Sequence, residues 1–283
     1  MRQDVKSIFT ISYHNIFEYP LTEEELSYWQ PGKALDMKLV GRAQVQQKGD
    51  YFFIKDRERL IGQRKKRKKL SRGKIRLAVK WAKTISIIPT VRMVGLTGAL
   101  AMDNARADSD VDLIIICQKS LLWTTRLAVV LLIDLLGIPR NARGKIEKDH
   151  LCLNMWLDEG DLVWPKNDRN FYTAHEIIQI VPLVNKNQVF SKLILKNSWT
   201  DYYWPKAARK VKETQVRSMR PANEKRFISQ YLYAAISKVF EPLAFRLQYL
   251  YMQKKITREL VTPGRAIFHP RDWGQIVKQN LGQ

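Results

Sequence analysis

The sequence of 283 residues has few of the side chains that build disulfide frameworks or structural metal sites. It contains only two cysteines, Cys117 and Cys152, and four histidines, with no Cys-x-x-Cys or His-x-x-x-His spacing. This scarcity excludes a disulfide scaffold and argues against a structural zinc site. Both cysteines lie next to or inside predicted core strands, so we interpret them as free buried thiols in a reducing compartment.

Long apolar runs are also lacking. The longest, residues 127–136, is interrupted by Asp134 and is shorter than a helix needs to be to span a bilayer. Residues 1–6 carry charges where a signal peptide would have an apolar core. These absences predict a cytoplasmic protein, in which residues 127–136 belong to a helix packed on a sheet.

Acidic residues are scarce beside basic ones. The chain has 27 Asp and Glu against 49 Lys and Arg, which gives a formal net charge of +22. Such an imbalance implies an acidic partner, most simply nucleic acid or an anionic membrane surface. The charge carries no information about the fold.

The basic residues concentrate between Arg57 and Lys83, where thirteen of them accompany a single acid, Glu58. Apolar residues that include Leu70 and Val79 recur there at helical spacing, which predicts a long helix. One interpretation is a track for RNA or DNA phosphates, and the other is a solvated helix that joins two domains. The residues predicted to contact nucleic acid are Arg64, Lys65, Lys66, Arg67, Lys68 and Lys69.

Two of the scarce acids form a pair at the entrance to a core strand. Asp110 and Asp112 directly precede the apolar run 113–116, and a second apolar run, 90–96, leads into Gly98. Side chains alternate along a strand, so the two carboxylates project from one face. Because they repel each other unless a cation lies between them, the pair predicts a Mg²⁺ site.

This segment resembles the DNA polymerase beta-like nucleotidyltransferase superfamily, whose pattern is Gly-Ser after one strand, a short helix, and Asp-x-Asp on the next strand. Gly98 matches the glycine, and residues 109–113 match the acidic segment. The resemblance implies transfer of a nucleoside monophosphate from a nucleoside triphosphate to RNA, a protein or a small molecule. It also implies that Asp110 and Asp112 hold Mg²⁺ or Mn²⁺. The residues that would contact the nucleotide are Gly98, Ala99, Ser109 and Arg106.

Two departures from the family pattern keep a second function open. Ala99 stands where the family usually has serine, and Asn154 occupies the predicted strand that normally supplies a third metal-binding carboxylate. Asn154 could ligate a metal but not act as a base, and Asp158 or Asp149 could replace it. The alternative is a catalytically degenerate nucleotidyltransferase fold that binds nucleic acid or an anionic surface.

Four regions are predicted along the chain. Residues 1–56 have the outline of a winged-helix module, three helices followed by the strand 51–54, and residues 57–84 form the basic linker helix. Residues 85–205 form the nucleotidyltransferase-like domain, an α+β unit with a mixed sheet and flanking helices. Residues 206–283 form a C-terminal helical region.

Further expectations concern the second half of the chain. Residues 162–164 are predicted to form an edge strand, and the proline-rich residues 262–271 to lack regular structure. His175, at a helix start, is expected to be structural rather than catalytic. The apolar face of a helix over 224–259, interrupted or kinked at Pro242, could pack inside the molecule, form a dimer seam or lie on a membrane. Intramolecular packing is the preferred interpretation, and peripheral membrane contact is not favoured.

Overall fold

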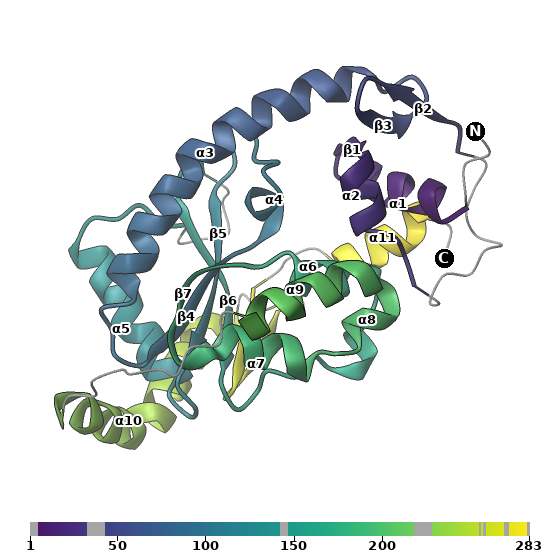
Figure 1. Ribbon diagram of the computed structural model, residues 1–283. Helices are drawn as coiled ribbons and strands as arrows, with labels where there is room; N and C mark the ends of the chain where they lie inside the picture. Colours follow the sequence, from purple (N-terminus) through teal and green to yellow (C-terminus); the bar gives the residue numbers. More distant parts are fainter. Residues whose placement is uncertain are drawn as a thin grey trace.

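The architecture is a central mixed sheet with helices on both faces, extended by a smaller N-terminal unit (Figure 1). The computed structural model describes residues 5–32, 43–141, 147–217, 228–254, 256, 259–268 and 272–281. The central sheet has six strands in the order β7-β4-β5-β6-β9-β8. The strands are β4 (Val91–Leu96), β5 (Val111–Cys117), β6 (Leu151–Asp158), β7 (Val181–Asn185), β8 (Leu260–Thr262) and β9 (Arg265–Ile267). Strands β5 and β6 are parallel and the other neighbours are antiparallel, so the predicted α+β class with a mixed sheet is confirmed.

Strand β5 lies at the centre of the sheet because its sequence is apolar on both faces. Leu113 and Ile115 belong to one hydrophobic cluster, whereas Ile114 and Ile116 belong to another on the opposite side. All four side chains are at most 1% exposed. A β-branched run with this burial is typical of a strand covered by helices on both faces.

Two layers of helices cover the sheet. On one face lie α3 (Arg59–Ile85), α5 (Leu122–Leu135) and α10 (Ile228–Gln253), and on the other lie α6 (Phe171–Ile178) and α7 (Val189–Lys196). The basic segment forms one uninterrupted helix, α3, as predicted. The other helices are α1 (Val5–Ile16), α2 (Glu23–Tyr28), α4 (Gly98–Ala101), α8 (Thr200–Tyr203), α9 (Pro205–Arg217) and α11 (Trp273–Leu281), with 3-10 turns at Lys166–Asp168 and Lys186–Gln188. Each helix among the described residues is too short or too polar to cross a bilayer.

The N-terminal unit combines helices α1 and α2 with a three-stranded sheet in the order β1-β3-β2. Its strands are β1 (Leu21–Thr22), β2 (Val45–Lys48) and β3 (Tyr51–Ile54). Thr22 and Glu25 form the capping box predicted at the start of α2. The third helix expected before the strand falls largely on residues 33–42, which lie outside the described residues, so the winged-helix module stays a prediction.

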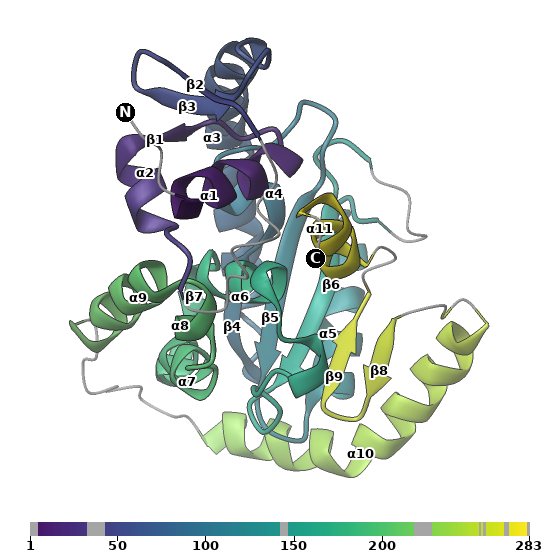
Figure 2. The same ribbon diagram turned by 90° about the vertical axis from the view of Figure 1, so that its right-hand side faces the viewer.

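The C-terminal end differs from the prediction. Residues 260–267 form the hairpin β8–β9, in which Pro263 and Gly264 make the turn, and β9 pairs with β6 (Figure 2). The edge strand expected at residues 162–164 does not form, because the Asn197 side chain binds the backbone groups of this segment. The Asn197 side chain donates to Leu162 O at 2.8 Å and accepts from Trp164 N at 2.8 Å. Part of the region 206–283 therefore completes the central sheet.

Candidate metal centre

Three potential metal ligands meet at one edge of the central sheet. Asp110 and Asp112 come from the start of β5, and Cys152 comes from the start of β6. One ligand atom from each of the three residues lies within 4.8 Å of the other two. Because β5 and β6 are parallel and Asp112 is paired with Cys152, their side chains emerge at the same level of the sheet. The predicted carboxylate pair is thus brought together, with a thiol as an additional neighbour.

The chain on the other side of Asp112 has to approach it closely. Gly98 follows β4 with φ of +63°, and a Cβ atom added there would lie 2.8 Å from Asp112 Oδ2. Thr97 N donates to Asp112 O at 3.1 Å, which fixes the Gly98 turn against β5. Both the positive φ and the close approach require glycine at this position.

Burial and mutual repulsion set the protonation of the cluster. Burial raises the pKa of Asp110, and burial together with the charge of Asp110 raises the pKa of Asp112 to about 7. Burial, followed by the charges of the two carboxylates, raises the pKa of the Cys152 thiol. At neutral pH the thiol is therefore protonated, and the carboxylate pair is poised to lose a proton when a cation arrives.

The immediate partners of the carboxylates are the Cys152 thiol and two neutral amides. Asn141 Nδ2 donates to Asp110 Oδ2 at 2.7 Å, and Asn154 Nδ2 donates to Asp112 Oδ1 at 2.8 Å. Within the described residues, the Oδ1 atoms of both asparagines are buried without a hydrogen-bond partner. Asn154 thus lies beside the pair as predicted, but it presents its amide nitrogen to Asp112. Inverting either amide would turn an unpartnered oxygen toward a cation.

Neither of the acids considered as a substitute for Asn154 lies in the cluster. Asp149 Oδ1 accepts from Lys74 Nζ at 2.6 Å. Asp158 pairs with Cys117 at the opposite end of the two strands. The pairing of β5 and β6 shifts by one residue just after Asp112, so the two strands do not keep one register along their whole length.

The residues predicted to contact the nucleotide differ in their exposure and in their hydrogen-bond partners. Arg106 is exposed, and its guanidinium lies 3.3 Å from Asp108. Ser109 Oγ donates to Arg106 O at 3.0 Å, and Ala99 is exposed on α4. Their roles toward a nucleotide stay predictions. The basic loop over residues 140–148, which the sequence predicts as a further contact for a triphosphate, falls largely on residues 142–146, outside the described residues.

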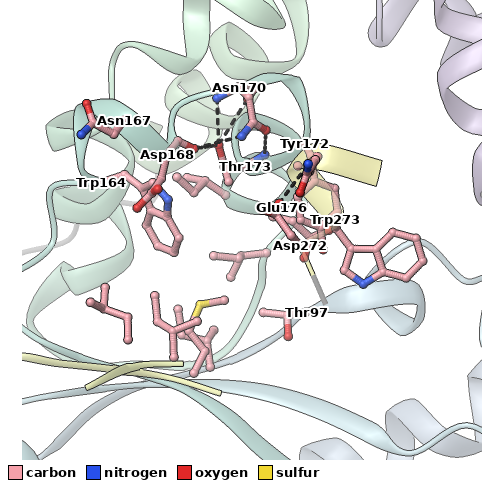
Figure 3. Close-up of a pocket in the computed structure, with 18 of the residues that line it drawn as sticks. Thr97, Trp164, Asn167, Asp168, Asn170, Tyr172, Thr173, Glu176, Asp272 and Trp273 are labelled. Atoms are coloured by element: carbon pink, nitrogen blue, oxygen red, sulfur yellow. Dashed lines mark hydrogen bonds between the residues drawn. The ribbon is translucent and has the colours of Figure 1, made fainter. Parts of the chain in front are cut away.

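A cavity of about 690 Å³ lies between the central sheet and helix α6 (Figure 3). Thr97, the neighbour of Gly98, lines it, and its floor includes Ile114, two residues beyond Asp112 on the same face of β5. Figure 3 shows Thr97 close to the sheet and Asn170 and Thr173 on the opposite side of the cavity. The size suits a small organic ligand, with an apolar floor and a polar rim. Helices α6 and α11 complete the wall, so the cavity joins chain segments far apart in sequence.

The cavity therefore covers the face of the sheet that carries Ile114, and Thr97 and Ile114 are the lining residues nearest in sequence to the Gly98 turn and to Asp112. No family model, curated protein or solved structure matches the chain. The order β4, α4 and β5 agrees with the strand, short helix and strand expected from the sequence.

Glu176 is a cavity residue that the sequence did not single out. It lies on α6, and burial together with the charge of Asp112 raises its pKa to about 8. A protonated carboxyl in the wall can donate a hydrogen bond to a ligand at neutral pH. The local pattern at Glu176, a Thr-x-x-Glu spacing from Thr173, predicts only the capping box of a helix start, and the structure forms that box from Asn170 and Thr173 instead.

Some basic side chains of α3 form ion pairs with the N-terminal unit, and others are exposed to solvent. Arg64 is 7% exposed and forms a bidentate ion pair with Glu25 at 2.6 and 2.8 Å. Arg67 pairs with Glu18. Arg64 thus joins α3 to the N-terminal unit, and this buried ion pair leaves its guanidinium little exposed for the predicted contact with nucleic acid. The exposed cations of α3 are Arg59, Lys65, Lys66, Lys68, Lys69, Arg72, Arg76, Lys80 and Lys83.

His175 packs in a buried aromatic cluster and is 5% exposed. Its ring stacks on Trp29 at 4.0 Å and also contacts Tyr13, His14 and Trp204. Burial lowers the pKa of His175 well below its usual value, so the imidazole is neutral. This environment agrees with the structural role that was expected.

Proposed function

We propose that the protein is a nucleotidyltransferase that moves a nucleoside monophosphate from a nucleoside triphosphate to an acceptor hydroxyl. The observation that carries the proposal is the pair Asp110 and Asp112 at the start of β5, approached by the glycine turn at Gly98 and hydrogen-bonded to neutral amides. Such a pair holds more negative charge than its protein neighbours offset. It therefore suits a divalent cation, which in turn suits a polyphosphate substrate.

The residues of the site fit a divalent cation. Asp110 and Asp112 would hold it, with the buried Oδ1 atoms of Asn141 and Asn154 available after inversion of their amides. When bound, the cation would offset the negative charge that develops on the triphosphate. Carboxylate and amide oxygens favour Mg²⁺, whereas the Cys152 thiol favours a softer ion such as Mn²⁺. We expect activity with Mn²⁺ to equal or exceed activity with Mg²⁺.

In the proposed reaction, the acceptor oxygen forms a bond to the α-phosphorus while the bond from that phosphorus to the bridging oxygen breaks. Pyrophosphate leaves, and the hydroxyl proton passes to solvent. The cavity would hold the part of the substrate that adjoins the reacting phosphate. Ile114 would make apolar contacts with this part, and Glu176 would donate a hydrogen bond to it. The walls of the cavity exclude some of the solvent and so orient this part of the substrate.

The test is transfer of label from each common nucleoside triphosphate carrying a labelled α-phosphate. The protein is incubated with Mn²⁺ or Mg²⁺, an RNA pool and a small-molecule extract. We expect label to appear on one acceptor class, and the Asp110→Asn, Asp112→Asn double variant to reduce transfer at least about a hundredfold. Absence of both transfer and metal-dependent nucleotide binding would reject the proposal.

A second candidate function is nucleic-acid binding through α3, and the exposure of its cations favours it. Lys65, Lys66, Lys68 and Lys69 are exposed on consecutive turns. Replacing these four lysines with glutamine is expected to weaken RNA binding and to make its dependence on salt shallower by about 3 in log–log slope. The Asp110→Asn variant is the control, because it should bind RNA like the unaltered protein. Equal salt dependence in both variants would reject this function.

A further inference from the structure

Helix α10 exposes a continuous apolar stripe. Ile236, Leu243, Leu247 and Leu250 are 51%, 53%, 59% and 58% exposed, and their spacing of three, four and seven residues places them on one side of the helix. The remaining members of the stripe are Val239, Phe240 and Tyr251, which are 77%, 54% and 70% exposed. A stripe of this size is more than the scattered exposed apolar residues of an ordinary surface.

The stripe is separate from the side by which α10 is anchored. Glu241 accepts hydrogen bonds from Trp123 N at 2.7 Å and Thr124 N at 2.9 Å, at the start of α5. Phe245 packs on the Trp123 ring at 5.1 Å, and Gln248 Nε2 donates to Trp123 O at 2.8 Å. The apolar face predicted from the sequence is therefore divided, and only part of it packs inside the molecule. The exposed part contributes nothing to holding the helix in place.

Helix α5 extends the same apolar surface. Leu127, Leu131 and Leu135 are 41%, 59% and 84% exposed and recur every fourth residue. Leu127 follows Arg126, whose guanidinium donates to Gln248 on α10 at 2.5 Å. Figure 2 shows α10 along the lower edge of the molecule, away from α1 and α11. The combined surface lies on the opposite side of the sheet from α6, which lines the cavity.

The exposed charges of helix α10 are positive. The exposed charged side chains of α10 among the described residues are Lys238 and Arg246, Lys254 directly follows the helix, and the one acid of α10, Glu241, is bound to α5. On α5, Asp134 is exposed and pairs with Arg140 at 2.6 Å. The rest of the chain adds to the positive charge, which totals +22.

We propose that α10 and the neighbouring leucines of α5 bind an anionic lipid surface. Apolar side chains of a helix lying flat enter the boundary between headgroups and acyl chains, while lysine and arginine at its edges meet anionic headgroups. Tyr251 suits this boundary because a tyrosine has an apolar ring and a polar end. A second copy fits less well, because a symmetric contact would place Lys238, Arg246 and Lys254 against the same cations.

The experiment is flotation of the full chain with vesicles of phosphatidylcholine alone or mixed with phosphatidylserine. We expect flotation only with the mixed vesicles. The Leu247→Ser, Leu250→Ser variant should partition at least about tenfold less, because it removes apolar side chains that would enter the bilayer. The matched control is Leu195→Ser on α7, where a leucine of 52% exposure lies outside the surface, and it should float like the unaltered protein.

Several outcomes would overturn the proposal. No flotation of the unaltered protein would do so, and equal flotation with phosphatidylcholine alone would reject the preference for anionic lipid. If the double variant floated like the unaltered protein, α3 would carry the binding through charge alone. A dimer in light scattering that the double variant converts to a monomer would assign the stripe to a second copy. Because transfer activity is measured without vesicles, failure here leaves the proposed function intact.

Discussion

The two ends of the strand pair β5–β6 carry the same two residue types with opposite surroundings. At one end Asp112 is paired with Cys152, and at the other Cys117 is paired with Asp158. In both places a glycine comes so close that a Cβ atom would lie 2.8 Å from the carboxylate oxygen, Gly98 at Asp112 and Gly160 at Asp158. Residue type and packing alone therefore do not distinguish the two ends.

The hydrogen-bond partners do distinguish them. Asp158 accepts hydrogen bonds from the backbone N–H groups of Ser120 and Gly160, and these two donors stabilise its negative charge. Burial raises the pKa of both carboxylates, but Asp112 also faces a second carboxylate, Asp110, and a neutral amide, and its pKa is raised to about 7. One carboxylate thus stabilises the fold, whereas the other retains the capacity to bind a cation.

The largest expected difference between the two ends is in transfer activity. Asp112→Asn is expected to reduce the rate at least about a hundredfold, because the site loses one of its two anionic ligands. Asp158→Asn is expected to retain the rate per folded molecule within about twofold and to lower the free energy of unfolding by about 1–3 kcal/mol, since an amide nitrogen then faces a backbone N–H. Labelled transfer and urea unfolding are the measurements.

The comparison would fail if Asp158→Asn, assayed at a temperature where it is folded, lost as much activity as Asp112→Asn. Asp108→Asn is the control for a general effect of removing negative charge, because Asp108 is 74% exposed in its side chain and lies in the same loop.

The sequence predicted one end of this strand pair well. The apolar runs before Gly98 and after Asp112 give β4 and β5 directly, and side-chain alternation places Asp110 and Asp112 together. Cys152 was assigned to packing because the pairing of two parallel strands, with its one-residue shift, is set by tertiary contacts. Sequence patterns do not contain that register.

Three further features could not be predicted from local sequence patterns, because they also depend on contacts between segments far apart in the chain. The hairpin β8–β9 was expected to be irregular because Pro263 is unfavourable within strands, yet proline and glycine are suited to the turn between them. Glu176 and the cavity depend on α6 and α11 meeting over β5. Helix α3 was predicted, whereas the burial of Arg64 depends on its partner Glu25 in a different unit.

A smaller effect is expected when Cys152 is replaced by a third carboxylate. Cys152→Asp should raise the affinity for Mg²⁺ by about tenfold, because a hard cation prefers oxygen to sulfur. The preference for Mn²⁺ over Mg²⁺ should decrease at the same time. Titration calorimetry with each ion measures both changes. Cys152→Ser is the control, since it replaces sulfur with a neutral oxygen, and equal Mg²⁺ affinity in all three proteins would show that residue 152 does not contact the ion.

The smallest expected effect is the pH dependence of stability without metal. Because the pKa of Asp112 is about 7 in the folded protein and about 4 in the unfolded chain, the folded state binds the extra proton between these values. Stability contributed by this proton is present at low pH and is lost as the pH rises from about 4 to 7. Asp112→Asn cannot lose a proton, so it should be more stable than the unaltered protein by about 1–2 kcal/mol at pH 8 and nearly equal at pH 4. Thermal unfolding across this range measures the difference. Saturating Mn²⁺ should reverse it, because only the unaltered protein gains the binding free energy of the ion.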